Sequence, residues 1–106
     1  MSRGVNKVML LGYVGNEPEL KRTPFGLPFI SLDISTEEVW TDKRTGERRR
    51  ETDWHKVLFF SKPAEICAEF AKKGSRVFIC GRLKTRKYTD KNNIERIVVE
   101  ILGDEW

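Results

Sequence analysis

A regular alternation of apolar and polar side chains along two segments constrains this fold more than any other feature of the sequence. In the segment that begins at Phe29, aliphatic residues occupy every second position, Ile30, Leu32 and Ile34, between Ser31, Asp33 and Ser35. In Thr52–Ser61 the odd positions His55, Val57 and Phe59 fall on one face, and Trp54, Lys56, Leu58 and Phe60, with Lys62 beyond, fall on the other. Because successive side chains of a strand point to opposite sides, both segments are predicted to be half-buried strands.

Three further strands and one helix are predicted around this pair. The apolar run in Val5–Val14 is typical of a strand buried on both faces, and Gly12 and Gly15 indicate a bend or bulge near its end. Pro63–Lys73 is predicted to be a helix, with an apolar stripe of Ile66, Cys67, Phe70 and Ala71 and with Gly74 just past its end. Arg76–Tyr88 and Ile94–Leu102 are the other predicted strands. The turns are expected at Pro24–Pro28, at Asp42–Glu47 with a positive φ at Gly46, and at Asp90–Asn93.

This order of elements predicts an all-β fold with one helix, namely a five-stranded OB-fold Greek-key barrel with the helix between strands 3 and 4. A chain of 106 residues suffices for one domain. We assign residues 1–103 to the barrel and residues 104–106 to a short acidic C-terminal end. The core of a chain this small is modest, so assembly into oligomers would add to its stability.

The positive charge of the chain is concentrated in two segments. The formal net charge is +4. Residues 41–51 hold five basic and three acidic side chains, a net +2, and residues 82–91 hold five basic and one acidic, a net +4. Concentrated positive charge predicts a polyanionic partner.

No catalytic site, metal or cofactor is expected. Cys67 and Cys80 have no CxxC partner and no histidine nearby, and are interpreted as buried, reduced thiols. His55 is the only histidine and lacks catalytic partners, and no phosphate-cradling glycine loop occurs. No apolar run approaches the roughly 20 residues of a membrane span and the N-terminus lacks a signal peptide, so we expect a cytoplasmic, nucleoid-associated protein without a membrane partner.

Two predicted strands combine aromatic and basic side chains on one face. Trp54 and Phe60 share a face with Lys56 between them, and the strand after the helix carries Arg82, Lys84, Arg86 and Tyr88 on one face. Aromatic rings stack on any base and basic side chains attract phosphates, so the pattern favours single-stranded nucleic acid. The alternatives are that the aromatics belong to the core and that the basic face is only solvated or protects a sheet edge. The coincidence on adjacent strands of this fold favours binding.

Five segments resemble the bacterial single-stranded DNA-binding protein family. They are Ser2–Val8, Glu17–Glu19, Thr52–Val57, Lys73–Ser75 and Gly81–Tyr88, and the similarity runs from Ser2 to about Ile101. In that family an OB-fold protomer assembles into a homotetramer, a dimer of dimers, around which single-stranded DNA wraps. The resemblance implies sequence-independent binding and protection of single-stranded DNA during replication, recombination and repair.

The resemblance also implies roles for individual residues. The stacking residues are Trp40, Trp54, Phe60 and Tyr88, where tyrosine replaces the usual tryptophan at position 88. The phosphate-binding residues are Arg3, Lys43, Lys56, Lys62, Lys73, Lys84, Arg86 and Lys87. Trp40 shares strand parity with Ile34 of the inner face, so a bend or bulge after Ser35 is expected to bring it to DNA. His55 lies opposite Trp54 and is expected at the subunit interface.

Members of that family usually continue into a disordered tail whose acidic tip recruits replication and repair enzymes. This sequence stops at Trp106, which suits a trimmed piece or a tailless member. A third interpretation makes Asp104, Glu105 and Trp106 a reduced tip. Two other functions remain open on the same fold: a protein-interaction or loading factor, and an RNA-binding domain, because stacking does not distinguish ribose from deoxyribose.

Overall fold

The chain forms six strands and one helix in the computed structural model, which describes residues 3–105. The strands are β1 (Val8–Val14), β2 (Lys21–Arg22), β3 (Pro28–Thr41), β4 (Arg48–Phe60), β5 (Arg76–Thr89) and β6 (Glu95–Glu105), and the helix α1 spans Ser61–Phe70. All five predicted strands and the predicted helix are present. The short β2 is the one element that the alternation did not indicate, since two residues carry no pattern.

Five of the strands close into a barrel. The sheet order is β1-β5-β6-β4-β3-β2, and an additional pairing of β1 with β3 closes the ring. The pair β4–β6 is parallel, through Val57 with Ile101 and Leu58 with Leu102, and the other pairs are antiparallel. Because α1 lies between β4 and β5, it follows the third long strand. The predicted five-stranded OB-fold barrel with one helix is confirmed.

Two glycines allow backbones to approach where the barrel closes. A Cβ on Gly12 would lie 2.1 Å from the carbonyl oxygen of Ser35, at the point where β1 passes from β5 to β3. A Cβ on Gly81 would lie 2.3 Å from the carbonyl oxygen of Leu102. Of the bend or bulge expected near the end of β1, no bulge interrupts the β1–β5 pair, because its register is continuous. The register shift lies instead in the β5–β6 pair, between Cys80 and Gly81.

The core lies inside the barrel and under the helix. Val57 and Phe59 of β4 are buried, as the alternation predicted, together with Ile30, Leu32 and Ile34 of β3. The helix contributes Ala64, Cys67 and Ala71. The predicted stripe is therefore half wrong, since Ile66 and Phe70 are exposed on the outer side of α1. Cys67 is buried and Cys80 only partly so, and both thiols are free.

β1 departs from its prediction, because only one of its faces is buried. Val14 lies in the core and Leu10 packs against it, whereas Met9 is 61% exposed and Leu11 is exposed beside it. Their cross-strand neighbours on β5 are Cys80 and Phe78. This outer face, Met9, Leu11, Tyr13 and Phe78, is mainly apolar and uncovered in the single chain.

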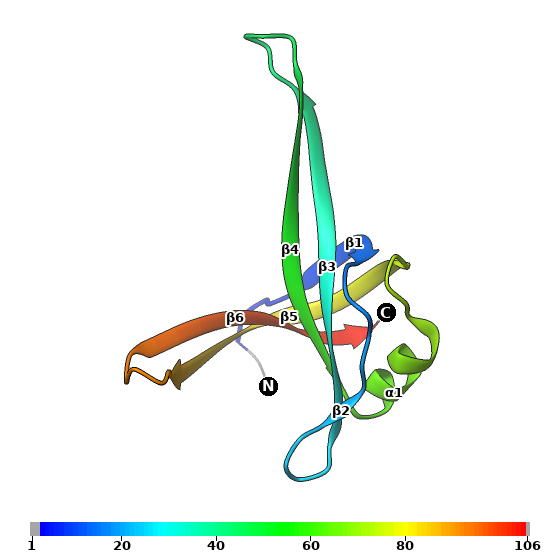
Figure 1. The fold of residues 1–106 in the computed structure, drawn as a ribbon, viewed down its shortest axis with the longest axis vertical. Coiled ribbons are helices and arrows are strands. Elements are labelled where there is room, and N and C mark those ends of the chain that lie inside the picture. Colours follow the sequence, from blue (N-terminus) through cyan, green and yellow to red (C-terminus); the bar gives the residue numbers. More distant parts are fainter. Residues whose placement is uncertain (1–2, 106) are drawn as a thin grey trace.

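The predicted turns are present, and two of them end long hairpins. Gly46 adopts φ +76° at the tip of β3–β4, and Asn93 adopts φ +59° at the tip of β5–β6. Both hairpins extend well beyond the barrel, in different directions, while α1 covers another side of the molecule (Figure 1). Beyond the barrel both faces of a hairpin meet solvent. Among residues 3–105, no helix has the length and apolar character of a membrane span.

Candidate nucleic-acid interface

A groove of about 650 Å³ crosses the outer face of the barrel. Its floor and walls come from five strands, β2 to β6, and from Thr23 just after β2. The lining residues are Lys21, Thr23, Phe29, Ser31, Lys56, Leu58, Phe60, Lys84, Arg86, Glu100 and Leu102. The groove thus brings together four predicted site residues from two strands, Lys56 and Phe60 of β4 with Lys84 and Arg86 of β5. Aromatic and aliphatic surface beside four basic side chains suits a ligand with flat rings and negative charges.

The aromatic end of the groove is formed by a pair of phenylalanines. Phe29 of β3 is directly opposite Phe60 of β4, and their ring centroids lie 6.0 Å apart with an interplanar angle of 29°. Phe60 is 36% exposed, so one part of the ring is supported by Phe29 and another part faces the groove.

The same face of β4 continues outward from the groove to Trp54. Period-2 alternation places Trp54 with Lys56, Leu58 and Phe60, as predicted, and the indole is 61% exposed. The inner side of the ring rests on Gly15, where an added Cβ would lie 2.2 Å from Cζ3 of the indole. Trp54 is therefore an exposed aromatic surface held in place from below.

Trp40 lies on the opposite face of the β3–β4 hairpin. The register runs unbroken from Phe29–Phe60 to Thr41–Arg48, so the bend or bulge expected after Ser35 is absent and Trp40 keeps the parity of Ile34. Its exposure of 44% arises because the hairpin has left the barrel at this point, not because the strand is rearranged. Trp40 and Trp54 consequently present their rings on different sides of one ribbon.

The two faces of this hairpin differ in charge. On the face that carries Trp54, Val39 lies opposite Arg50 and Thr41 lies opposite Arg48. Arg50 also lies 3.9 Å from Glu37. The face of Trp40 holds Glu38 directly opposite Glu51, with Asp53 next along β4 and Arg49 opposite the indole. Arg49 also pairs with Asp42 and Glu47, each at 3.5 Å. The basic character is thus on the Trp54 side, which lines up with the groove.

The β5–β6 hairpin carries Tyr88 beyond the other end of the groove. Tyr88 shares a face with Lys84 and Arg86, as predicted, and is 44% exposed. Lys87 points to the other face, where its Nζ lies 4.0 Å from Glu95. At the turn, the Asp90 carboxylate accepts hydrogen bonds from the Ile94 and Asn92 backbone N–H groups and from Arg96. These bonds, that of Ile94 first, lower the pKa of Asp90 below its ordinary value of 3.8.

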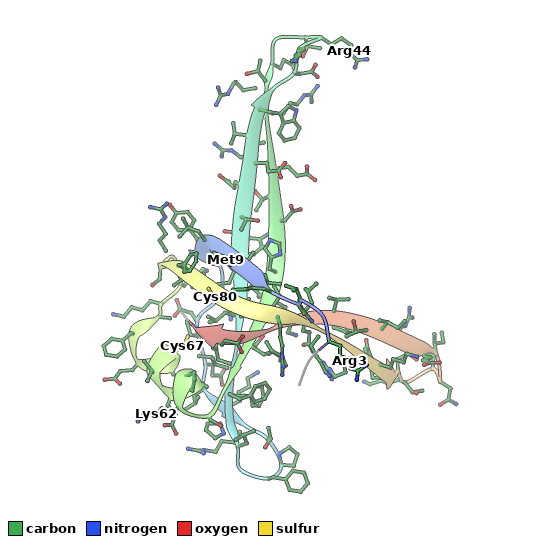
Figure 2. All side chains as sticks on the ribbon, turned by 180° about the vertical axis from the view of Figure 1, so that it is seen from behind. Arg3, Met9, Arg44, Lys62, Cys67 and Cys80 are labelled. Carbon is green, nitrogen blue, oxygen red and sulfur yellow. The ribbon has the colours of Figure 1, made fainter. Side chains whose placement is uncertain are left out.

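The other predicted phosphate ligands are exposed but spread over the surface. Lys43 lies in the turn between β3 and β4, next to Arg44, which is labelled at the tip of this hairpin in Figure 2. Lys73 lies in the turn after α1. Lys62 lies in the first turn of α1, so the alternation of β4, which ends at Phe60, does not place it beside Lys56. Arg3 precedes β1. None of these four residues lines the groove.

His55 is partly buried on the face opposite Trp54. Its Nε2 lies 2.9 Å from the hydroxyl of Thr36, a single hydrogen bond that serves the β3–β4 pair. Within residues 3–105, no group of three His, Cys, Asp or Glu side chains is placed to hold a metal ion. The third member of the proposed acidic tip, Trp106, lies outside the described residues, whereas β6 continues through Asp104 to Glu105.

Seven lining residues were not among the predicted site residues, and three of the seven are charged or aromatic: Lys21, Phe29 and Glu100. Phe29 could have been predicted, because centring the first hairpin on its predicted turn, Asp42–Glu47, puts Phe29 opposite Phe60. Centring the second hairpin on Asp90–Asn93 puts Glu100 opposite Leu83, one residue from its observed partner Lys84 and on the wrong face. Lys21 gave no signal, since its place depends on the two-residue strand β2. Glu100 is the unexpected member, because it is the one acidic side chain among basic, neutral polar and apolar lining residues.

Comparison with known proteins gives a consistent result. The model of the single-strand binding protein family matches residues 5–106. Among solved structures, the chain is similar to the SSB of Plasmodium falciparum in complex with single-stranded DNA, with a TM-score of 0.82 and 31% identity over 96% of this chain and 89% of that chain. It is also similar to a deletion mutant of the single-stranded DNA binding protein from Thermus aquaticus, with a TM-score of 0.82 and 28% identity. That match covers 99% of this chain and 50% of the Thermus chain.

Proposed function

Because the chain belongs to the single-strand binding protein family, we propose that it binds and protects single-stranded DNA, whatever its sequence, during replication, recombination and repair. Proteins of this family bind DNA and are not enzymes, which agrees with the expectation from the sequence. In this proposal bases stack on Trp54, Phe60 and Tyr88, with Trp40 as a separate platform. Phosphates are held by Lys56, Lys84 and Arg86, with Arg3, Lys43, Lys62, Lys73 and Lys87 along the outer path.

The observation that carries the proposal is the groove together with its continuation along β4. Phe60 lines the groove and Trp54 lies six residues away on the same face, roughly 20 Å along the strand. This span suits several nucleotides of an extended strand, and Lys56 lies between the two rings. A path of this kind, with rings at intervals and cations beside them, is what sequence-independent binding requires.

We further propose a homotetramer, built as a dimer of dimers. On one side β1 pairs with β5 from Val8 to Tyr13, whereas on the other side it pairs with β3 only at Tyr13 and Val14. An edge strand with a free side from Val8 to Gly12 can pair with β1 of a second copy. The exposed face of Met9, Leu11 and Phe78 offers apolar surface for a further contact. His55, next to this region through Ile34 and Thr36, is the proposed interface histidine.

The test is a titration with poly(dT), followed by Trp fluorescence at several salt concentrations. We expect quenching on binding and an affinity whose logarithm falls with the logarithm of salt concentration, by about 0.7 per phosphate contacted. Phe60→Ala should weaken binding, by about 1–3 kcal/mol for one lost base stack.

Phe70→Ala is the matched control, because this exposed phenylalanine lies on α1 and does not line the groove. Its affinity for poly(dT) should equal that of the unmodified protein. An absence of quenching, or an affinity independent of salt, would show that the proposed function is wrong.

A further inference from the structure

Glu100 is a buried carboxylate in the proposed DNA groove. Glu100 is only 4% exposed, although it lines the groove together with Lys84 and Arg86. The Nε of Arg86 donates a hydrogen bond to Oε1 of Glu100 at 3.1 Å, and Lys84 is its direct cross-strand neighbour on β5. Burying a charge is costly even when it is paired, so stability alone gives little reason for a carboxylate at this position.

The groove has a floor, which contains Glu100 and apolar side chains, and a rim of basic side chains. Glu100 and Leu102 of β6 alternate onto the same face, and Leu102 is adjacent to Leu58 of β4. The aromatic pair Phe29–Phe60 completes the floor at its other end. The basic side chains Lys21, Lys56, Lys84 and Arg86 are all exposed residues, so their charged groups meet solvent around this floor.

A phosphate is repelled from such a floor, because the carboxylate of Glu100 lies there and like charges in a partly dry site interact strongly. A base is not repelled, since Phe60 and the two leucines offer apolar and aromatic contact to its ring. The groove therefore favours a strand that turns its bases inward and keeps its phosphates at the rim.

We infer that the floor is a subsite for a single base and that Glu100 makes this subsite favour cytosine over thymine. The inference rests on the proposed binding of single-stranded DNA and specifies one position within it. Arg86 is the only described side chain that hydrogen-bonds to Glu100, through Oε1. A carboxylate can accept a hydrogen bond from the 4-amino group of cytosine, whereas thymine has a carbonyl oxygen at this place.

The test measures binding to a dT oligonucleotide of eight nucleotides and to a series in which one thymidine at a time is replaced by deoxycytidine. This length lies within the roughly 4–16 nucleotides that one OB fold covers. At one or two positions cytosine should raise the affinity of the unmodified protein by about tenfold or more, the effect of one hydrogen bond to a charged acceptor. At those positions, replacing cytosine by 2-pyrimidinone, which lacks only the amino group, should remove the gain.

The variant Glu100→Gln keeps the size of the side chain but removes its charge. We expect it to bind dT oligonucleotides at least as tightly as the unmodified protein and to lose the preference for cytosine. Glu37→Gln is the matched control, because Glu37 also pairs with an arginine, at 3.9 Å, but lies outside the groove. It should keep the preference at the same positions.

The outcomes separate this inference from the proposed function. If the unmodified protein binds the oligonucleotides but cytosine and 2-pyrimidinone are equivalent at every position, the base subsite at Glu100 is refuted while DNA binding stands. This comparison uses the unmodified protein and so does not depend on whether Glu100→Gln folds. If no oligonucleotide binds, the proposed function itself fails.

Discussion

Among single residues, the two cysteines occupy different environments although the sequence treats them alike. Cys67 faces the core from α1, and burial raises the pKa of its thiol from 9.0 to about 11. Cys80 lies on the outer side of β5, opposite Met9, and is partly exposed. Alternation along β5 would have shown this difference, because Ile79 beside it belongs to the core.

We therefore expect iodoacetamide at about pH 8 to modify Cys80 but not Cys67 in the folded protein. The thiolate is the form that reacts. At this pH the raised pKa keeps the Cys67 thiol protonated, and burial keeps the reagent away from it. Peptide mass mapping after a short reaction measures each site, and the same reaction in urea is the control in which both sites should react. Modification of Cys67 at the rate seen in urea would contradict the structure.

A second prediction concerns the contact between Gly15 and Trp54. Gly15→Ala places a Cβ where the indole now lies, so the ring must move. We expect a change in Trp fluorescence and a loss of up to about tenfold in affinity for poly(dT), within the range of one stacked base.

Gly4→Ala serves as the comparison for this variant, because nothing lies within 4 Å of the added Cβ. It should match the unmodified protein in fluorescence and affinity. If Gly15→Ala keeps its fold by circular dichroism and binds poly(dT) as tightly as the unmodified protein, the contact of Trp54 with Gly15 does not contribute to DNA affinity.

For the strands and helix, alternation identified most of the fold because it reports which side chains share a face. It placed Trp54 with Phe60 and Lys84 with Arg86, and centring the β3–β4 hairpin on its predicted turn would have added Phe29. The same step for the β5–β6 hairpin would have put Glu100 opposite Leu83, one residue from its observed partner Lys84. It could not show where a strand leaves the barrel. That is why Trp40 is exposed without a bulge. The period-2 pattern also ends where the strand ends. Lys62 lies in α1, so its predicted place on the face of Lys56 is wrong.

The β5–β6 turn gives a prediction about pH. The pKa of Asp90 is lowered in the folded state, mainly by the hydrogen bond from the Ile94 N–H and then by Arg96. A lowered pKa means that the ionised carboxylate stabilises the fold above its ordinary value of 3.8, and that this contribution is lost as the pH falls through the lower, folded value. Lowering the pH through this range should therefore destabilise the β5–β6 hairpin.

Urea unfolding between about pH 2 and about pH 6 measures this effect. In Asp90→Ala the free energy of unfolding should be lower near neutral pH and should change less with pH over the acid range. Asp90→Asn keeps an acceptor oxygen for the turn but does not titrate, so it should share the weaker pH dependence. An unchanged dependence in both variants would assign the acid sensitivity to other carboxylates.

For the whole molecule, the least predictable property was the uncovered outer face of β1. The apolar run in this strand predicted burial on both sides, and the single chain buries only one. A sequence pattern states that surface should be buried but not which molecule covers it. The proposed assembly supplies a cover from a second copy.

The assembly is tested by Leu11→Lys, which puts a charge on this outer face without entering the core. Sedimentation equilibrium should show smaller species than for the unmodified protein. The Tm should also lose its dependence on protein concentration, which is expected when association stabilises the fold.

Ile97→Lys is the corresponding control, since Ile97 is an exposed aliphatic residue on the β5–β6 hairpin, away from this face. Its association should be unchanged. If Leu11→Lys associates as strongly as Ile97→Lys, the outer face of β1 is not the contact between copies.

The contact of Trp54 with Gly15 also bears on the entropy of the proposed binding. A Cβ on Gly15 would lie 2.2 Å from Cζ3 of the indole and 2.5 Å from Cη2, so the ring already touches the backbone at this residue. A side chain that is held before its partner arrives loses little rotational freedom when the partner binds. In the proposed complex, a base that stacks on Trp54 therefore meets a surface that is already in position.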